Sequence, residues 1–200
     1  DAFNALFPAG QVEGQEARRW LAALAGIQDH IRAHPQIDTI FDSFPISVKA
    51  GMGYGDTRWQ IIRSSGGARA TYWFRGDSLN GAVLAEKSAL PGDIILDTNA
   101  LGLFKDELDV EPAGVCFRIT NIRFDLHAPA PIPNPEPDRA AMGVFFPEEV
   151  ARLPAIGEFR QVVNLFVDIP INIPDEHLIA PFMETVYELQ AQYGGFFLRP

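Results

Sequence analysis

Cysteine, basic residues and long apolar runs are all scarce in this sequence of 200 residues. The single cysteine, Cys116, excludes an internal disulfide framework and is typical of a reducing compartment. Lys and Arg number 16 against 26 Asp and Glu, which gives a net charge of −10 and argues against a surface that neutralises nucleic-acid phosphates. No apolar run approaches the ~20 residues that span a bilayer, and no signal-peptide pattern is visible. We therefore expect a cytoplasmic protein without a membrane span.

Histidine is also sparse, and its spacing does not suggest a metal site. The four histidines, His30, His34, His127 and His177, form no pair with an acid between them at ligand spacing. We expect them on the surface. Cys116 lies in an apolar stretch, so we expect a small core residue rather than a ligand.

The clearest pattern of secondary structure in the sequence lies in residues 70–97. Aromatic and β-branched residues predict a strand over 70–74. Gly76 then turns the chain into a helix with Asp77 or Ser78 as its cap, Pro91 and Gly92 end that helix, and a second strand follows over 93–97.

The segments before this stretch predict a helix, a glycine-rich strand and a hairpin. Apolar residues at three- and four-residue steps predict a helix from Gln15 to Pro35. The strand over 44–55 ends in glycines at 51, 53 and 55, which could form a phosphate loop or allow close backbone approach. A phosphate loop requires a helix directly after it, whereas residues 57–63 and 70–74 predict a hairpin. Close approach is therefore favoured.

The segments after this stretch predict a short helix, two strands, a linker and another β–α pair. The helix covers 98–104 with Thr98 as its cap, and the strands cover 115–120 and 122–126. Alternating prolines from 129 to 137 favour an extended linker. A buried strand is then predicted from residue 158, followed by a helix over 175–193 with glycine at its end.

The order of these motifs resembles the class III nucleotide cyclase (adenylyl/guanylyl) catalytic domain. The match rests on Gly76-x-x-x-Asn80 opening a helix and on the strand that starts with Pro91-Gly92-Asp93. The resemblance implies an α+β, ferredoxin-like domain in which Asn80 orients a ribose. Leu84 stands where the active half of the family has a triphosphate-binding Arg, and Trp73 stands where the family has its purine-selecting acid.

Two further matches imply a tandem similar to the soluble adenylyl cyclase branch. The opening run DAFNALFP resembles the hairpin strand that carries the family's second metal carboxylate, which would be Asp1. The run RQVVNLFVDI resembles the start of another cyclase domain, whose first metal carboxylate would be Asp168. Each aspartate could instead be a solvated chain or strand end without a role. At the position of the branch's bicarbonate-sensing Arg stands Val83.

The resemblance implies a first cyclase-like domain over 1–127 without its N-terminal part, a Pro-rich linker over 128–157 and the start of a second domain over 158–200. We expect a fragment that makes no cyclic nucleotide alone. With a second cyclase domain, from the same chain or a dimer mate, the whole would convert ATP, or GTP, to a cyclic nucleotide using Mg²⁺ or Mn²⁺. Two alternatives remain open: a pseudo-cyclase module of a signalling protein, and a plain interaction domain of ferredoxin-like topology.

Overall fold

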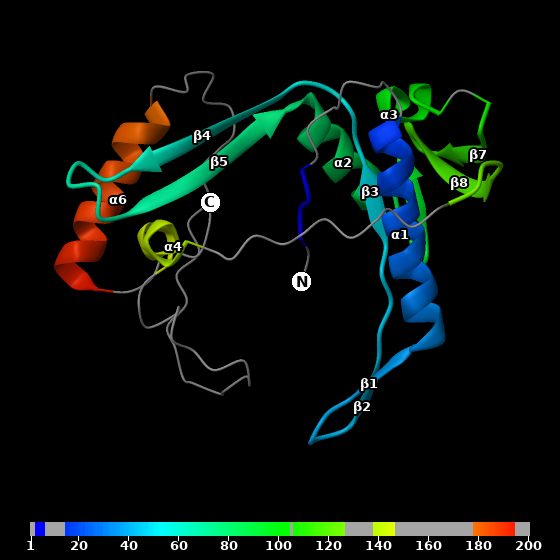
Figure 1. Ribbon diagram of the computed structural model, residues 1–200, viewed down its shortest axis with the longest axis horizontal. Helices are drawn as coiled ribbons and strands as arrows, with labels where there is room; N and C mark the ends of the chain where they lie inside the picture. Colours follow the sequence, from blue (N-terminus) through cyan, green and yellow to red (C-terminus); the bar gives the residue numbers. More distant parts are fainter. Residues whose placement is uncertain (1–2, 7–14, 105, 127–137, 147–177, 195–200) are drawn as a thin grey trace. The chain divides into compact units, whose positions relative to one another are not determined.

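The computed structural model in Figure 1 describes residues 3–6, 15–104, 106–126, 138–146 and 178–194. The chain divides into two compact units. The first unit comprises Asp1–Arg58 and Phe74–Ile132, and the second comprises Trp59–Trp73 and Pro133–Pro200. The described residues contain both helices and strands, and antiparallel and parallel strand pairs both occur, so the predicted α+β class is confirmed.

The first unit is built on a four-stranded sheet. Its strands lie in the order β3 (Ala50–Met52), β6 (Ile94–Leu96), β8 (Cys116–Ile122) and β7 (Leu108–Ala113). Strands β3 and β6 are parallel, with Gly51 opposite Ile95, whereas β6–β8 and β7–β8 are antiparallel. A helical crossover therefore joins β3 to β6, as parallel neighbours require.

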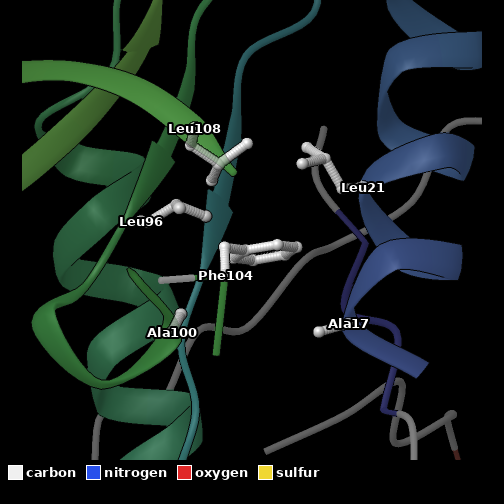
Figure 2. Packing of buried hydrophobic residues seen from close by; sticks show 6 residues of the cluster. All are labelled: Ala17, Leu21, Leu96, Ala100, Phe104 and Leu108. Atoms are coloured by element: carbon white, nitrogen blue, oxygen red, sulfur yellow. The ribbon is translucent and has the colours of Figure 1, made fainter. Parts of the chain in front are cut away.

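Helices cover both faces of this sheet. Ile95 and Leu96 are consecutive in β6, so their side chains point to opposite faces, and both are fully buried. Leu96 packs with residues of α1 (Gln15–Ala33) and α3 (Thr98–Gly102), as Figure 2 shows. The members of this cluster are Ala17, Leu21, Leu96, Ala100, Phe104 and Leu108. Ile95 packs on the other face with Ala85 of α2 (Asp77–Lys87), Ala89 and Cys116.

A buried polar side chain fixes α1 on the sheet. Gln28 is 3% exposed, and its Nε2 donates to the carbonyl of Val48, 2.9 Å away, and to that of Asp93, 3.4 Å away. These carbonyls precede β3 and β6, which are parallel neighbours. One amide on α1 thus contacts the starts of both strands, and its burial costs little because both of its N–H donors have partners.

Two hairpins leave the sheet. The first pairs β1 (Gln36–Asp38) with β2 (Ser43–Pro45), and Ile37 lies opposite Phe44. The second pairs β4 (Thr57–Arg63) with β5 (Ala70–Gly76) and leads from the first unit into the second and back.

The second unit is described for its part of the β4–β5 hairpin, α4 (Arg139–Phe145) and α6 (Ile179–Tyr193). Ile62 of β4 packs against Met183 and Tyr187 of α6, and these three side chains are buried. The Tyr72 and Phe145 rings lie 6.3 Å apart between centroids.

Several predicted elements are confirmed. The helix from Gln15, the hairpin over 57–63 and 70–74, the helix after Gly76 and the strand within 93–97 are all present. The described part of the helix predicted over 175–193 is α6. Helix α4 lies inside the range predicted as the 128–157 linker, and the remainder of that linker and of the 158–200 domain lies outside the described residues, apart from 178–194.

The strand predicted over 115–120 is confirmed as β8, whereas the strand predicted over 122–126 is wrong. The observed pair is β7, Leu108–Ala113, and β8, Cys116–Ile122, joined at Gly114, whose φ of 67° lies in the left-handed region. The β7 segment LDVEPA contains Asp, Glu and Pro, which strands disfavour. Strand β7 lies at the edge of the sheet, so the backbone on its outer side pairs with no other strand of this sheet. A proline without an N–H, such as Pro112, is tolerated in such a strand.

Candidate functional site

The position of α2 is set by Gly51 of β3 and by Gly53, which directly follows that strand. A Cβ atom placed on Gly51 would lie 2.3 Å from the carbonyl oxygen of Ala82, and one on Gly53 would lie 2.2 Å from that of Ser78. Only glycine at both positions lets the strand backbone approach the helix backbone this closely. The close-approach interpretation of these glycines is therefore confirmed, and the segment after Gly55 continues into β4 rather than into a helix.

The start of α2 differs from the prediction. The N-cap residue is Gly76, and no side chain caps the helix, so the roles predicted for Asp77 and Ser78 are wrong. Gly76 has φ 141°, and a Cβ atom there would lie 2.1 Å from the carbonyl oxygen of Asp56. The hydroxyl of Ser78 instead hydrogen-bonds the hydroxyl of Thr57. A backbone constraint thus fixes where the helix begins. The helix also ends earlier than predicted, at Lys87, before Pro91.

Asn80 is exposed in the first turn of α2. Helix α2 runs antiparallel to β3, because Gly53 contacts its start and Gly51 its middle. Its first turn therefore lies at the edge where the parallel strands β3 and β6 have their carboxyl ends. In open α/β sheets, ligands bind at that edge, so Asn80 occupies a position suited to a polar ligand.

Asp97 lies beside Gly81, the residue after Asn80, at the same edge. It follows β6 directly, and a Cβ atom on Gly81 would lie only 2.0 Å from its Oδ2. Its Oδ1 accepts a hydrogen bond from the Ala100 amide at 2.6 Å, so Asp97 is the N-cap of α3, and the predicted Thr98 cap is wrong. The half-buried carboxylate is thus held in place between two helices, with Oδ2 facing α2.

Asp97 was not singled out as a candidate from the sequence. The available signal is a carboxylate placed directly after a buried strand and before a short helix, in the run Ile94-Ile-Leu-Asp-Thr. That pattern predicts an N-cap, and only the fold shows that the cap lies next to Gly81 and Asn80.

Asn80 shares its helix face with apolar side chains. Val83 is 40% exposed and Leu84 is 46% exposed, and Lys87 continues the same face at a three-residue step. The position at which the cyclase family carries its triphosphate-binding Arg is thus an exposed leucine. This face therefore combines one amide, two apolar side chains and one cation.

Cys116 lies beneath the site and is a core residue, as predicted. It is 1% exposed and packs with Ala85, Ala89 and Ile95. Burial raises the pKa of its thiol, and the negative charge of Asp97 raises that pKa further, while a hydrogen bond with Ser88 opposes the shift. The neutral thiol is the form that fits this environment.

The described histidines are surface residues, as predicted. His30 and His34 are exposed, their ring centroids lie 4.5 Å apart, and Nδ1 of His34 hydrogen-bonds the carbonyl oxygen of His30 at 3.0 Å. Among the described residues, no three His, Cys, Asp or Glu side chains gather as a metal site would require. His127 and His177 lie outside those residues.

The two aspartates predicted to bind metal, Asp1 and Asp168, also lie outside the described residues. Trp73, at the position of the purine-selecting acid, is partly buried and packs against the cluster of Ile62, Met183 and Tyr187 in the second unit. Of the site residues predicted from the resemblance, the structure thus places Asn80.

The comparisons with protein families and with curated proteins give no match. No protein-family model matches this chain, and no curated protein is significantly similar to it. In the part of the chain that the structure describes, no helix has both the length and the apolar character that crossing a bilayer needs.

Proposed function

We propose that the chain is part of a class III nucleotide cyclase that converts ATP to cyclic AMP and pyrophosphate at the interface of tandem cyclase domains. The observation that supports this most is the placement of Asn80. It lies exposed in the first turn of α2, at the carboxyl edge of β3 and β6, and the next residue, Gly81, contacts Asp97. The amide offers two donors and one acceptor to a ribose at that edge.

The finer fold belongs to the same proposal. A ferredoxin-like cyclase domain with a partial second copy agrees with the parallel β3–α2–β6 crossover and the antiparallel β8 beside it. The contacts of Gly51 and Gly53 with α2 support this proposal, because they hold the helix that carries Asn80 against the strand backbone.

Asp1 would be a ligand of the metal ions, Mg²⁺ or Mn²⁺, in the first cyclase domain, and Asp168 would be a metal ligand of the second domain. Carboxylate oxygens are the hard ligands that these ions prefer, whereas the described residues contain no group of three suitable side chains. Bound there, the ions would activate the ribose 3′ oxygen and stabilise the leaving pyrophosphate. In the cyclisation the 3′ oxygen forms a bond to the α-phosphorus, the bond from that phosphorus to the β-phosphate oxygen breaks, and the 3′ proton goes to a base.

The role of Asn80 follows from its neighbours. Leu84, one helical turn further on, offers no charge to a triphosphate. Asn80 therefore faces a degenerate second site in this proposal, and the productive base and triphosphate contacts belong to the partner domain.

A second candidate function is a pseudo-cyclase module that regulates a signalling protein. The observation in its favour is the exposure of Val83 and Leu84 beside Asn80. Apolar side chains on the face that would meet a partner domain suit a protein contact better than a triphosphate.

The experiment that separates the two functions uses the full-length protein with ATP and Mg²⁺ or Mn²⁺, and measures cyclic AMP. We expect Asp1→Ala to lower turnover by at least ~100-fold, because it removes a ligand of ions that stabilise the developing charge. Asn80→Ala should leave turnover nearly unchanged. Asp106→Ala, at an exposed aspartate away from the α2 edge, is the matched control.

Equal turnover of Asp1→Ala and the unchanged protein would contradict the metal assignment. A full-length protein that makes no cyclic nucleotide with either ion, although its thermal unfolding is normal, would favour the pseudo-cyclase module.

A further inference from the structure

The β1–β2 hairpin exposes apolar side chains to an unusual degree for so short an element. Ile37 is 50% exposed, Phe44 is 51% exposed and Ile40, in the turn, is 90% exposed. In Figure 1 the hairpin follows the C-terminal end of α1. An isolated pair of strands is only marginally stable in water and normally gains stability from further strands or a packed face.

The hairpin turn is nevertheless held by several hydrogen bonds. The Thr39 amide donates to the Asp42 carbonyl at 2.9 Å, and the Thr39 hydroxyl donates to the same carbonyl at 2.8 Å. The Ser43 amide donates to Oδ1 of Asp42 at 2.8 Å. Because the apolar side chains stand on a hydrogen-bonded frame, a partner would not need to order this segment on binding.

The two faces of the hairpin differ in polarity. Backbone hydrogen bonds join Thr39 to Asp42 and Ile46 to Pro35. In an antiparallel hairpin, hydrogen-bonded and non-hydrogen-bonded pairs alternate, so Ile37 and Phe44, which lie midway between these two pairs, also form a hydrogen-bonded pair. Opposite residues share a face, which places Ile37 and Phe44 together. The other face is polar, and there the Ser43 hydroxyl donates to Oε1 of Gln36 at 3.3 Å.

The two edges of the hairpin also differ. The backbone groups that point outward belong to the residues between the hydrogen-bonded pairs, namely Gln36 and Asp38 on β1, and Ser43 and Pro45 on β2. Pro45 has no N–H, so the β2 edge lacks a donor. The β1 edge has both donors and both acceptors, which makes it the edge that can accept another strand.

We propose that the β1 edge pairs with the β1 edge of a second copy of this chain, forming a two-fold symmetric, four-stranded sheet. In the proposed register Gln36 of one copy exchanges two hydrogen bonds with Asp38 of the other, because this pairing uses all the outward groups of both β1 strands. Ile37 then faces its own counterpart across the two-fold axis. On one face of the four-stranded sheet, Ile37 and Phe44 of one copy then form a continuous apolar row with Ile37 and Phe44 of the other.

The charges of the hairpin allow a second copy as the occupant. In the proposed register Asp38 of each copy lies opposite the uncharged Gln36 of the other, so no two carboxylates face each other. The end of α1 at the hairpin base carries His30, Arg32 and His34, and Arg32 is paired with Asp29. Residues 35–48 contain no Lys or Arg, which argues against an anionic membrane as the occupant.

The proposed contact is small and should be weak. Interfaces below ~1,200 Å² are typical of transient complexes, and two three-residue strands cannot bury more than that. We therefore expect a dimer that forms over roughly 10 µM to 1 mM, with Kd in the same range. This inference does not depend on the proposed cyclase activity.

The first test is a disulfide across the two-fold axis. Non-hydrogen-bonded antiparallel partners have Cα atoms ~4.5 Å apart, which suits a disulfide. Under mild oxidation we expect Ile37→Cys to give a covalent dimer at a rate at least ~10-fold above that of Val115→Cys, a matched control at a residue that is 69% exposed in another turn. The native Cys116 is buried and should not interfere.

The second test is a charge exchange at the same position, followed by sedimentation. Ile37→Glu alone and Ile37→Lys alone should each raise Kd at least ~10-fold, because like charges would face each other across the axis. An equimolar mixture of the two variants should restore the dimer.

A protein that stays monomeric up to ~1 mM would overturn the proposal, as would equal cross-linking of Ile37→Cys and Val115→Cys. A mixture that fails to restore dimers would overturn the symmetric register. Binding of the monomer to phosphatidylcholine vesicles, lost in Ile37→Glu, would assign the hairpin to lipid instead.

Discussion

Replacing Gly53 by alanine should separate α2 from β3, and the structure sets the size of the effect. The added Cβ would lie 2.2 Å from the Ser78 carbonyl oxygen and 2.3 Å from the Ala82 amide nitrogen, whereas ordinary contact begins at 3.4 Å. Both neighbours are backbone atoms, so no side chain can rotate away and the helix must move by about 1 Å. Overpacking of this kind costs ~1–3 kcal/mol, and we expect about 3 kcal/mol here.

The measurement is native-state hydrogen exchange of peptides from α2, because it reports this helix separately from the second unit. A loss of ~3 kcal/mol corresponds to roughly 100-fold lower protection in Gly53→Ala. The control is Gly26→Ala in α1, where a Cβ meets nothing within 4 Å. An alanine in an exposed helix interior should stabilise by ~0.5–1 kcal/mol. Unchanged protection of α2 in Gly53→Ala would refute the close approach of the two backbones.

Two predictions concern pH. Burial raises the pKa of the Cys116 thiol in the folded protein. The contribution of this group to the free energy of unfolding is therefore complete below the unfolded pKa of ~8.5 and is lost as pH rises through the folded pKa. Urea unfolding at several pH values should show this loss of stability, and the Cys116→Ala variant should not show it. Hydrogen bonds from Arg123 and Asn121 lower the pKa of Asp109, so its contribution is present above ~3.9 and is lost as pH falls through the folded pKa. NMR titration should find that pKa higher in Arg123→Gln, and an unchanged value would contradict the pairing.

The elements that the sequence predicted well are those whose local pattern agrees with their packing. Helix α1 has apolar residues at helical steps, and Ala17 and Leu21 from that stripe are buried in the core. The turn at Gly66 and Gly67 lies between two strands rich in aromatic and β-branched residues, and β4 and β5 form there. In both cases neighbouring residues carry the whole signal.

The errors occur where distant residues decide the local structure. Asp77 and Ser78 are good capping residues by type, but the approach of Asp56 to Gly76 fixes the helix start, and Thr57 takes the Ser78 hydroxyl. Strand β7 was missed because its composition disfavours a strand, while its position at the edge of a sheet permits one. Neither the loop before α2 nor an edge position can be read from local composition.

In the candidate site, too, one residue could be predicted from the local sequence and another depends on distant contacts. The resemblance predicted Asn80, and the fold places it exposed at the start of α2. Asp97 lies 17 positions further along the chain, and its proximity depends on the β3–β6 pairing and on Gly81, which leaves room for its carboxylate. A contact made through a parallel crossover cannot be inferred from the spacing of its two residues.

The two glycines in and directly after β3 nevertheless contain a signal that relates the sequence to the packing of α2. Two residues along a strand advance ~6.6–6.8 Å, and four residues along a helix advance ~6.0 Å. Gly51 lies in β3 and Gly53 directly follows that strand, and they contact α2 at Ala82 and Ser78, which are four residues apart. The near equality of the two advances lets glycines at i and i+2 fit successive turns of one helix. This spacing therefore predicts a helix packed directly on the strand backbone, and it explains why the glycines do not need a phosphate to account for them.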